Sequence, residues 1–315
     1  MAFDFTNAWT LLEANKHSSD TLKKGVIETL VQESPILEML PFTPISGNAI
    51  KVKVEATLPS VQFRDVNEEY SKSYGTDTDR LFGVAILGGE VFIDNFLLKV
   101  KANKVDAKAM QYAKFAKAMS RTFDKQFFDG TGAAKDFMGV NALIDEGLGM
   151  EYGSSTGAAL SLDGLDEAND LFRGQASADT ILLNRTLRRK ITNLGRNTSG
   201  GFALIDVGTD VFGRQVTQWN GIPLRIIGDD KDGNAILGFD EDPGDATADT
   251  ASIYFCAFGA DENISGLAGA GGSMEVRDFG ETEAAPGHLG RVEWYPGLAI
   301  YNPFSIVRYG GITNA

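Results

Sequence analysis

The sequence predicts an α+β fold organised around one long helix. Residues 90–129 contain neither glycine nor proline, although the chain of 315 residues has 36 glycines. Inside this stretch, apolar residues recur at steps of three and four, which is the period of one helix face; they are Val105, Ala109, Tyr112, Ala116, Met119, Phe123 and Phe127. A helix over Lys99–Phe128 would be roughly 45 Å long at about 1.5 Å per residue, with a stop at Gly130. Few single domains need so long a helix, so the stretch reads as a structural spine.

The composition is that of an ordinary soluble globular protein. Hydrophobic residues make up 43% of the chain and charged residues 23%. No run of about 18 apolar residues occurs, so the sequence predicts no membrane span. The first residues lack the basic flank and apolar run of a signal peptide. The single cysteine, Cys256, excludes an intramolecular disulfide and is expected to be a buried small side chain.

The charge is negative overall but uneven along the chain. The formal net charge of −14 argues against a general nucleic-acid binder. The predicted spine, in contrast, carries a basic face whose candidate interface residues are Lys101, Lys104, Lys108, Lys114, Lys117 and Arg121. Such a face is either a solvated helix surface or one that meets an acidic neighbouring subunit or packaged nucleic acid. Charge alone leaves both interpretations open.

Two segments before the spine have little to bury within themselves. Residues 1–45 resemble an arm in which Thr21–Leu40 is amphipathic and broken by prolines, so we expect it to pack on the body or on a neighbour. Ile50–Val54 and Leu81–Ile93 have strand composition and flank a long polar segment. This pattern predicts an extended hairpin whose tip is ordered by a partner. The candidate tip contacts are Arg64, Asp65, Glu68, Glu69 and Tyr70.

The rest of the chain alternates between short strands, helices and loops. Up to residue 200, the patterns predict a turn and strand at Met138–Ile144, a glycine-rich loop at 145–160, a helix at Ser161–Arg173, a buried strand at Thr180–Asn184 and a basic helix at Asn184–Leu194. After it, they predict a hairpin around Asn220-Gly221, a tight acidic turn at Asp229–Asn234, a buried strand at Ile253–Phe258 and a flexible loop at Gly266–Gly272. Closing strands are predicted near 291–295 and 299–308.

Residues that could carry chemistry are sparse. A histidine-dependent triad would have to use His17 or His288. Gly153–Gly157 matches G-x-S-x-G in form but lacks the strand before it and the helix after it. The turn at Asp229–Asn234 fails the register of a calcium loop, and no phosphate-binding loop motif occurs. The sequence therefore predicts no catalytic residue, no metal site and no cofactor.

The order of elements resembles that of a known family. The stretches that carry the resemblance are Thr122–Gly132 at the end of the spine, Met138–Val140 after it, Ile181–Asn184 before a basic helix, Asn220–Leu224 in a later hairpin, and Trp294–Leu298 with Ile306–Ile312 at the close. In this order they are similar to the major capsid proteins of tailed phages with the Hong Kong 97-type fold. The similarity spans nearly the whole chain, and the order of the motifs is more specific than any one of them.

The resemblance implies a domain organisation. We expect an N-terminal arm at 1–45, an extended hairpin loop at 46–93, a peripheral domain with the spine helix at 94–145, a mixed α/β axial domain at 146–274, and a return to the peripheral domain at 275–315. It also implies that the hairpin reaches across a neighbouring subunit.

The resemblance further implies a function and partners. The chain would form pentamers and hexamers that close into an icosahedral shell, without membrane contact, around double-stranded DNA bound without sequence specificity. Its location would be the virion, after assembly in the cytoplasm of a bacterial host. Because no long helical scaffolding segment precedes residue 45, we expect a separate scaffolding protein, together with a portal and, in some relatives, a decoration protein.

Three questions stay open at this level. An encapsulin-like compartment shell shares the implied fold, and an enzyme of an unrecognised α+β class is a third hypothesis. Some relatives crosslink a hairpin lysine to an asparagine of the peripheral domain. Lys51, Lys53 or Lys72 with Asn302 are the pairs that the resemblance allows, and no motif selects among them.

Overall fold

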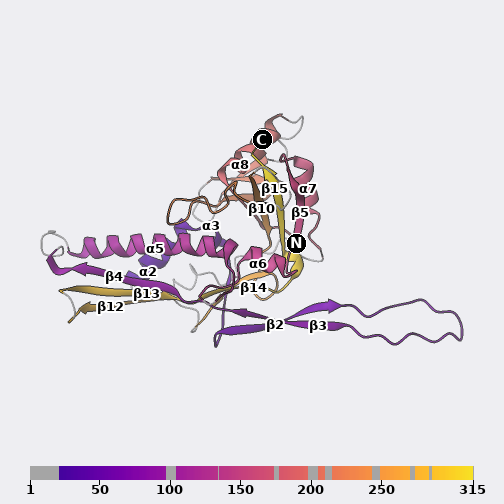
Figure 1. Cartoon of the computed structure of the whole chain (residues 1–315), viewed down its shortest axis with the longest axis horizontal. Coiled ribbons are helices and arrows are strands. Elements are labelled where there is room, and N and C mark those ends of the chain that lie inside the picture. Colours follow the sequence, from indigo (N-terminus) through magenta and orange to yellow (C-terminus); the bar gives the residue numbers. More distant parts are fainter. Residues whose placement is uncertain are drawn as a thin grey trace.

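The computed structural model describes residues 21–96, 104–133, 135–173, 177–197, 205–209, 215–242, 249–269, 274–283 and 286–314. Figure 1 shows an upright sheet with helices, a long helix lying beside its own sheet on one side, and a hairpin that projects on the other. None of the helices in these ranges is long and apolar enough to cross a membrane.

The upright part is built on a seven-stranded mixed sheet. In spatial order its strands are β5 (Met150–Ala158), β15 (Ile306–Thr313), β10 (Thr250–Cys256), β6 (Thr180–Leu183), β9 (Ile222–Ile226), β8 (Gln215–Trp219) and β7 (Ile205–Thr209). β6 and β10 are buried along their whole length, which confirms the two predicted buried strands. Helices α7 (Leu162–Asn169) and α8 (Arg185–Asn197) place Leu165, Leu187 and Ile191 in the core of this sheet. The side chain of Ser161 caps α7, as expected.

The spine helix, α5 (Lys104–Asp129), lies along a three-stranded sheet formed by β12 (Glu275–Glu281), β13 (Gly287–Trp294) and β4 (Leu87–Asp94). The predicted apolar stripe is buried from Tyr112 to Phe127, and the rings of Phe123 and Trp294 lie 5.1 Å apart. Ala109 is exposed, so among the described side chains the buried stripe begins at Tyr112. The predicted first turn of the helix and the side chain of Val105 lie outside the described residues.

The arm packs against the body of its own subunit. Helix α2 (Thr21–Glu33) lies on α5, and its apolar face is buried there. Helix α3 (Pro35–Met39) follows, with Ser34 as its N-cap and Pro35 in its first turn, where proline fits. Strand β1 (Phe42–Pro44) then joins β11 (Ile264–Ala268) and β14 (Pro296–Ile300) in a second small sheet. The prediction that the arm needs a surface to pack on is confirmed, and the surface belongs to the same chain.

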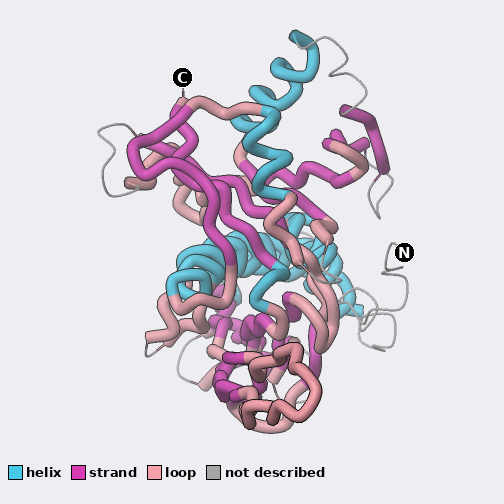
Figure 2. Tube along the Cα trace, turned by 90° about the vertical axis from the view of Figure 1, so that its right-hand side faces the viewer, coloured by secondary structure: helices cyan, strands magenta, loops and turns pink. Residues whose placement is uncertain are grey.

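The extended hairpin consists of β2 (Ala49–Thr57) and β3 (Thr76–Gly83), paired antiparallel. Val52 and Phe82 anchor its base in the main hydrophobic core. Beyond Thr57 and Thr76 the two segments run on away from the body (Figure 1). In Figure 2 the hairpin points toward the viewer, beneath the upright sheet.

The hairpin is shorter than predicted, because Leu81–Ile93 forms parts of two strands. β3 ends at Gly83, whereas β4 begins at Leu87 and pairs with β13 instead of β2. Val91 and Ile93 point their apolar side chains into the core that β4 shares with the spine. Residues 87–94 therefore belong with the spine helix.

Three local predictions are wrong, and two of them fail because glycine-rich segments form strands. Residues 150–158 form β5 and residues 264–268 form β11. A Cβ atom at Gly153 would lie 2.1 Å from the carbonyl oxygen of Gly310, and one at Gly266 would collide with the ring of Phe42. Glycine at both positions permits close approach of a neighbouring strand or ring. The predicted strand within 138–144 is instead α6 (Val140–Asp145), since Val140, Leu143 and Ile144 have helical spacing and are buried.

Two of the expected domain boundaries also need correction. β15, expected in the returning peripheral segment, lies between β5 and β10 in the upright sheet. β11, expected in the axial domain, pairs with β1 and β14. β11 is buried along its whole length and β15 along most of it, so each fits where apolar layers cover it. A short 3-10 helix, η3 (Pro303–Ser305), separates β14 from β15.

Candidate subunit interfaces

The end of the hairpin is a turn held by its own polar groups. The backbone amide of Glu68 donates to the carbonyl of Asp65 at 3.2 Å, and the amide of Asp65 donates to the Glu68 carboxylate at 2.9 Å. Asn67 has φ of 71°, a left-handed conformation that asparagine tolerates. The guanidinium of Arg64 lies 5.1 Å from the centre of the Tyr70 ring. Four of the five predicted tip residues thus contact one another, while Glu69 is exposed.

The same segment exposes large apolar side chains. The exposed fraction is 92% for Val61, 105% for Phe63 and 88% for Val66. Leu58, Tyr70 and Tyr74 are also exposed. The prediction of a tip poor in apolar residues was therefore wrong. Within the described residues, the hydrogen bonds of side chains from 58 to 75 stay inside this segment. An apolar surface of this kind is typical of an interface that lacks its partner.

Most of the described basic residues on the spine have partners within the subunit. Lys108 pairs with Asp278 at 3.2 Å, and its ammonium group also lies 3.3 Å from Nδ1 of His288. Lys117 pairs with Glu33 of the arm at 3.0 Å. Arg121 donates to the backbone carbonyl of Asp230 at 3.5 Å. These contacts favour an internal role for much of the basic face.

Lys114, Lys101 and Lys104 are the other basic candidates on the spine. Lys114 is exposed, and no ion pair of this residue occurs among the described side chains. Lys101 and the side chain of Lys104 lie outside the described residues. The structure thus does not bring the six predicted residues together into one continuous basic surface.

Lys125, which was not among the candidate residues, makes a contact that sequence spacing does not reveal. Its ammonium group lies 3.1 Å from the carboxylate of Asp230, which is only 3% exposed. The backbone amides of Asn234 and Asp232 also donate to that carboxylate. The amide of Asn234 and the ammonium group of Lys125 hold the pKa of Asp230 at about 2, well below its usual value, against the opposing effect of burial. The tight acidic turn predicted at Asp229–Asn234 is confirmed, and it binds the spine.

The arm is fastened to two different parts of the body by buried polar contacts. Ser34 donates a hydrogen bond to the carboxylate of Asp124 on the spine. Burial raises the pKa of Asp124 to about 7, and the hydrogen bond from Ser34 offsets part of that rise. Glu38 pairs with Arg225 of β9 at 3.3 Å, and the two side chains are 2% and 10% exposed. The arm thus joins the spine to the upright sheet.

A groove opens at the base of the hairpin. It has a volume of about 760 Å³ and lies between β2, β3, the loop before β5, and the segment that leads into η3. Its basic lining residues are Lys53, Arg80 and Arg173, and its apolar lining includes Leu148, Met150 and Phe304. Lys53 and Asn302, one of the pairs considered for a crosslink, both line it. Lys51 instead pairs with Asp79 at 2.6 Å, and Lys72 is exposed near the tip.

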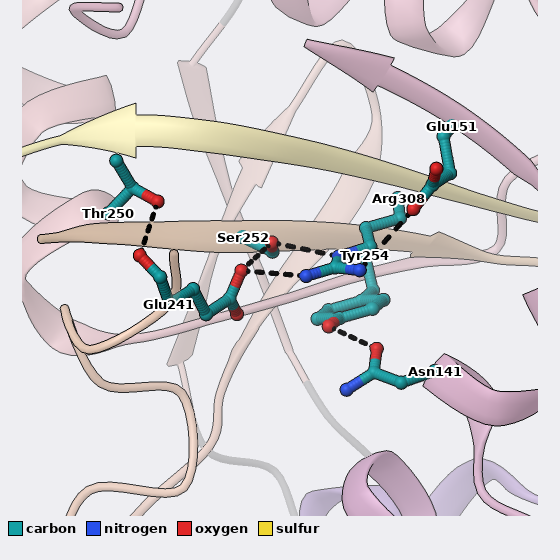
Figure 3. A network of polar contacts seen from close by, with 7 residues as sticks. All are labelled: Asn141, Glu151, Glu241, Thr250, Ser252, Tyr254 and Arg308. Carbon is teal, nitrogen blue, oxygen red and sulfur yellow. Dashed lines mark hydrogen bonds and ion pairs between the residues drawn. The ribbon is translucent and has the colours of Figure 1, made fainter. Parts of the chain in front are cut away.

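One polar cluster in the upright sheet could be mistaken for a catalytic site. Figure 3 shows Arg308 of β15 pointing between carboxylates from two other segments. Its guanidinium lies 2.9 Å from Glu241 and 3.3 Å from Glu151, and its Nε donates to Ser252 at 3.1 Å. The hydroxyl of Tyr254 donates to Asn141 at 2.7 Å. Burial raises the pKa of Tyr254. Because these groups satisfy one another, the cluster acts as a clamp across β5, β10 and β15.

Comparison with known families and structures gives a consistent result. Residues 18–149 match the family model described as Major capsid protein GP7. No curated protein sequence matches the chain. This part of the chain includes residues 18–45 of the arm, the hairpin and the spine.

The solved structures extend the similarity to most of the chain. The holo-SrpI encapsulin complex from Synechococcus elongatus PCC 7942 has a TM-score of 0.64 at 15% identity, over 90% of this chain and 89% of the other. The capsid of a native GTA particle has a TM-score of 0.60 at 12% identity, over 89% and 91%. Microbacterium phage Oxtober96 gives 0.59 at 14% identity, over 88% and 90%. At such identities the matches establish the shared fold.

Proposed function

We propose that the chain is a shell-forming structural subunit, a major capsid protein with the Hong Kong 97-type fold, and that its shell is a phage head enclosing double-stranded DNA. The shell would close with icosahedral symmetry from pentamers and hexamers of this chain. Contact with DNA would be independent of base sequence, as expected for a chain of net charge −14 that carries only local basic surfaces.

The observation that carries this proposal is the extended hairpin. Exposure of an apolar side chain such as Phe63 to water is unfavourable in free energy. The described part of the same subunit does not bury the hairpin tip. A neighbouring subunit would bury these groups. Each contact can be weak, because closure of a shell repeats it many times. The tip residues Arg64, Asp65, Glu68, Glu69 and Tyr70 are the proposed contacts.

The basic residues of the spine have a narrower proposed role than their charge suggests. Lys114 is the described candidate for contact with a neighbour or with packaged DNA, since it is exposed. Lys101 and Lys104 remain candidates on sequence grounds. Lys108, Lys117 and Arg121 already contact acidic side chains or a carbonyl of the same subunit, so we assign them first to holding the subunit together.

The proposed partners follow from the proposed shell. They are further copies of this chain, a separate scaffolding protein, a portal and, on the outer surface, a decoration protein. The protein would reside in the virion after assembly in the bacterial cytoplasm. We also propose that it is not an enzyme, because the cluster around Arg308 offers carboxylates that are already engaged by a guanidinium.

The test is direct imaging of the purified protein by electron microscopy, alone and with its scaffolding protein. Closed or tubular assemblies are the expected result. A protein that stays monomeric over a wide range of concentration and ionic strength, with scaffold present, would contradict the proposal.

An encapsulin-like compartment is the second candidate, favoured by the similarity to the encapsulin complex with a TM-score of 0.64. The material inside particles isolated from cells separates the two. DNA together with a portal supports the phage head, whereas a co-purifying enzyme enclosed in a small particle supports the compartment.

A further inference from the structure

A cavity of about 300 Å³ lies where the arm meets the upright sheet, and it is called the arm cavity below. The end of α2, helix α3, helix α8 and strands β8 and β9 surround it. Its charged and other polar lining residues include Glu33 and Glu38 of the arm, Arg188 of α8, Gln215 and Thr217 of β8, and Arg225 of β9. We propose that the arm cavity is a binding site for a small oxyanion of the size of inorganic phosphate, held by the guanidinium of Arg188.

The guanidinium of Arg188 has no partner of its own in the described structure. Its Nε atom is buried and donates to no hydrogen-bond acceptor. None of the ion pairs among the described side chains includes Arg188. An arginine keeps its charge throughout the pH range in which proteins are folded, so it cannot escape this state by losing a proton. A buried donor without an acceptor is unfavourable, and an oxyanion in the cavity would supply the acceptor.

Arg188 differs from the other arginines of its helix. Arg185, Arg189 and Arg196 are exposed to solvent, whereas Arg188 is partly buried and lines the cavity. It directly follows Leu187, which is buried in the core of the upright sheet. One arginine of α8 is therefore turned toward the protein while the other three face water.

The carboxylates that line the arm cavity already have bases of their own. Glu38 pairs with Arg225 at 3.3 Å. Glu33 pairs with Lys117 of the spine at 3.0 Å. With Arg188 included, two acids stand against three bases, so these groups carry a net of one positive charge. A cavity with this balance attracts an anion rather than a cation.

The same cavity offers further donors and a suitable size. Gln215 and Thr217 are two residues apart on β8, so their side chains lie on the same face of the strand. Guanidinium, hydroxyl and amide groups are the side-chain donors that bind phosphate and carboxylate oxygens. The volume of about 300 Å³ equals that of roughly ten water molecules at about 30 Å³ each. It admits an oxyanion with hydration water but no folded segment of protein.

An oxyanion bound in the arm cavity would lie between three parts of one subunit. The arm, α8 and β8 all contribute lining residues, although they are distant in the sequence. Because the unfolded chain does not bring these residues together, the ligand binds the folded state alone. Its binding therefore stabilises the packed position of the arm on the sheet.

Thermal melting of the full chain in sodium phosphate tests the site, with sodium chloride at matched ionic strength as the reference. The melting temperature of the wild type should rise with the phosphate concentration. Arg188→Gln should weaken the binding of phosphate, measured by isothermal titration calorimetry, by roughly tenfold or more, since it removes the charged donor. Arg189→Gln is the matched control at the exposed next position of the same helix and should bind phosphate like the wild type.

Thr217→Val provides a second variant in case Arg188→Gln does not fold. It removes the hydroxyl and keeps the branched shape that suits a strand, and it should also weaken the binding of phosphate. Unchanged binding by both folded variants would mean an adventitious ion only and would overturn the proposal. A wild type that melts at the same temperature in phosphate and in chloride overturns it as well.

Competition identifies where the oxyanion comes from, because inorganic phosphate and the phosphodiester groups of nucleic acid share this chemistry. A short single-stranded oligonucleotide that displaces phosphate from the wild type, and fails to bind Arg188→Gln, supports the site with nucleic acid as the source. Phosphate that remains bound in the presence of the oligonucleotide supports the site with the free ion as the ligand. These measurements need no assembled particle, so their outcome is independent of the proposed shell function.

Discussion

The ammonium group of Lys125 lies 3.1 Å from the carboxylate of Asp230, and this contact joins the end of the spine helix to a turn that follows β9. The hydrogen bond and the charge of Asp230 raise the pKa of Lys125. Arg121, one turn earlier, donates to the backbone carbonyl of Asp230. Together with Lys108 and Lys117, these residues connect the spine to the sheet beside it, to the arm and to the upright sheet.

We expect Asp230→Asn to lower the melting temperature of the subunit at neutral pH. A carboxylate whose pKa is lowered to about 2 on folding stabilises the native state above its unfolded value near pH 4, and this contribution is lost as the pH falls toward 2. The difference between wild type and variant should therefore shrink over that interval. Thermal melts at about pH 6 and about pH 3 measure it. Lys114→Ala, at an exposed position of the same helix, should change neither value.

Asp124 should produce the opposite dependence on pH. Its pKa is raised to about 7 by burial, so the folded state binds a proton that the unfolded state has released, and stability falls as the pH rises from about 4 to about 7. A shift of this size corresponds to a loss on the order of 4 kcal/mol. Asp124→Asn should make this slope smaller in denaturant titrations at several pH values, and the remainder should come from Asp179, whose pKa burial raises to about 6. Asp145→Asn, at an exposed position, should leave the slope unchanged. Parallel curves for wild type and Asp124→Asn would show that the buried carboxyl is not the source.

Ala116→Asp should destabilise the subunit strongly. Ala116 is fully buried on the spine stripe, so the new carboxylate would lose its hydration without gaining a partner, at a cost of roughly 3 kcal/mol or more. Ala109→Asp is the matched control, because it introduces the same group two turns earlier at an exposed position. Denaturant unfolding monitored by circular dichroism compares the two. Equal stability of both variants would mean that the buried face has been misassigned.

The ion pair between Glu38 and Arg225 should behave as a unit. Arg225→Met leaves the Glu38 carboxylate buried without the guanidinium, which costs roughly 3–5 kcal/mol. Glu38→Met combined with Arg225→Met should recover much of that loss, because two thioether side chains bury no charge. A double-mutant cycle from denaturant unfolding gives the coupling energy. Additive single effects would argue against direct coupling of arm and sheet.

Phe63→Ser should separate stability from assembly. Phe63 is fully exposed at the hairpin tip, so the change should alter the unfolding free energy by no more than about 0.5 kcal/mol. The yield of assembled particles should nevertheless fall, since apolar area buried between subunits is lost. Phe127→Ser is the comparison, because its ring is buried in the subunit core and its loss should unfold the chain. Normal assembly of Phe63→Ser would remove the apolar tip from the interface.

The regular periods in the sequence predicted much of the fold. The spine stripe from Tyr112 to Phe127, the buried strands β6 and β10 and the cap at Ser161 all follow from local spacing and side-chain chemistry. The glycine-rich strands were missed, since Gly153 and Gly266 are required by the closeness of Gly310 and Phe42, which only the tertiary structure reveals.

The polar contacts of the interfaces were harder to predict than the elements that carry them. Lys125 and Asp230 are 105 residues apart, and nothing local marks either as the partner of the other. The described lysines of the spine that form ion pairs take their acids from the arm, from the sheet and from a turn, which local spacing does not reveal. The exposed apolar residues of the tip are visible in the sequence at 58–74, where they stand among many charged residues.

The position of β15 inside the upright sheet has a consequence for how the subunit matures after synthesis. Arg308 of β15 contacts Glu151 of β5, its neighbour in the sheet, across 157 residues of chain, and β15 fills the place between β5 and β10. Until residues 306–313 leave the ribosome, the strand that pairs with both β5 and β10 is missing. Long-range parallel pairing of this kind is slow to form. A nascent chain therefore cannot complete its upright sheet before residues 306–313 have been synthesised.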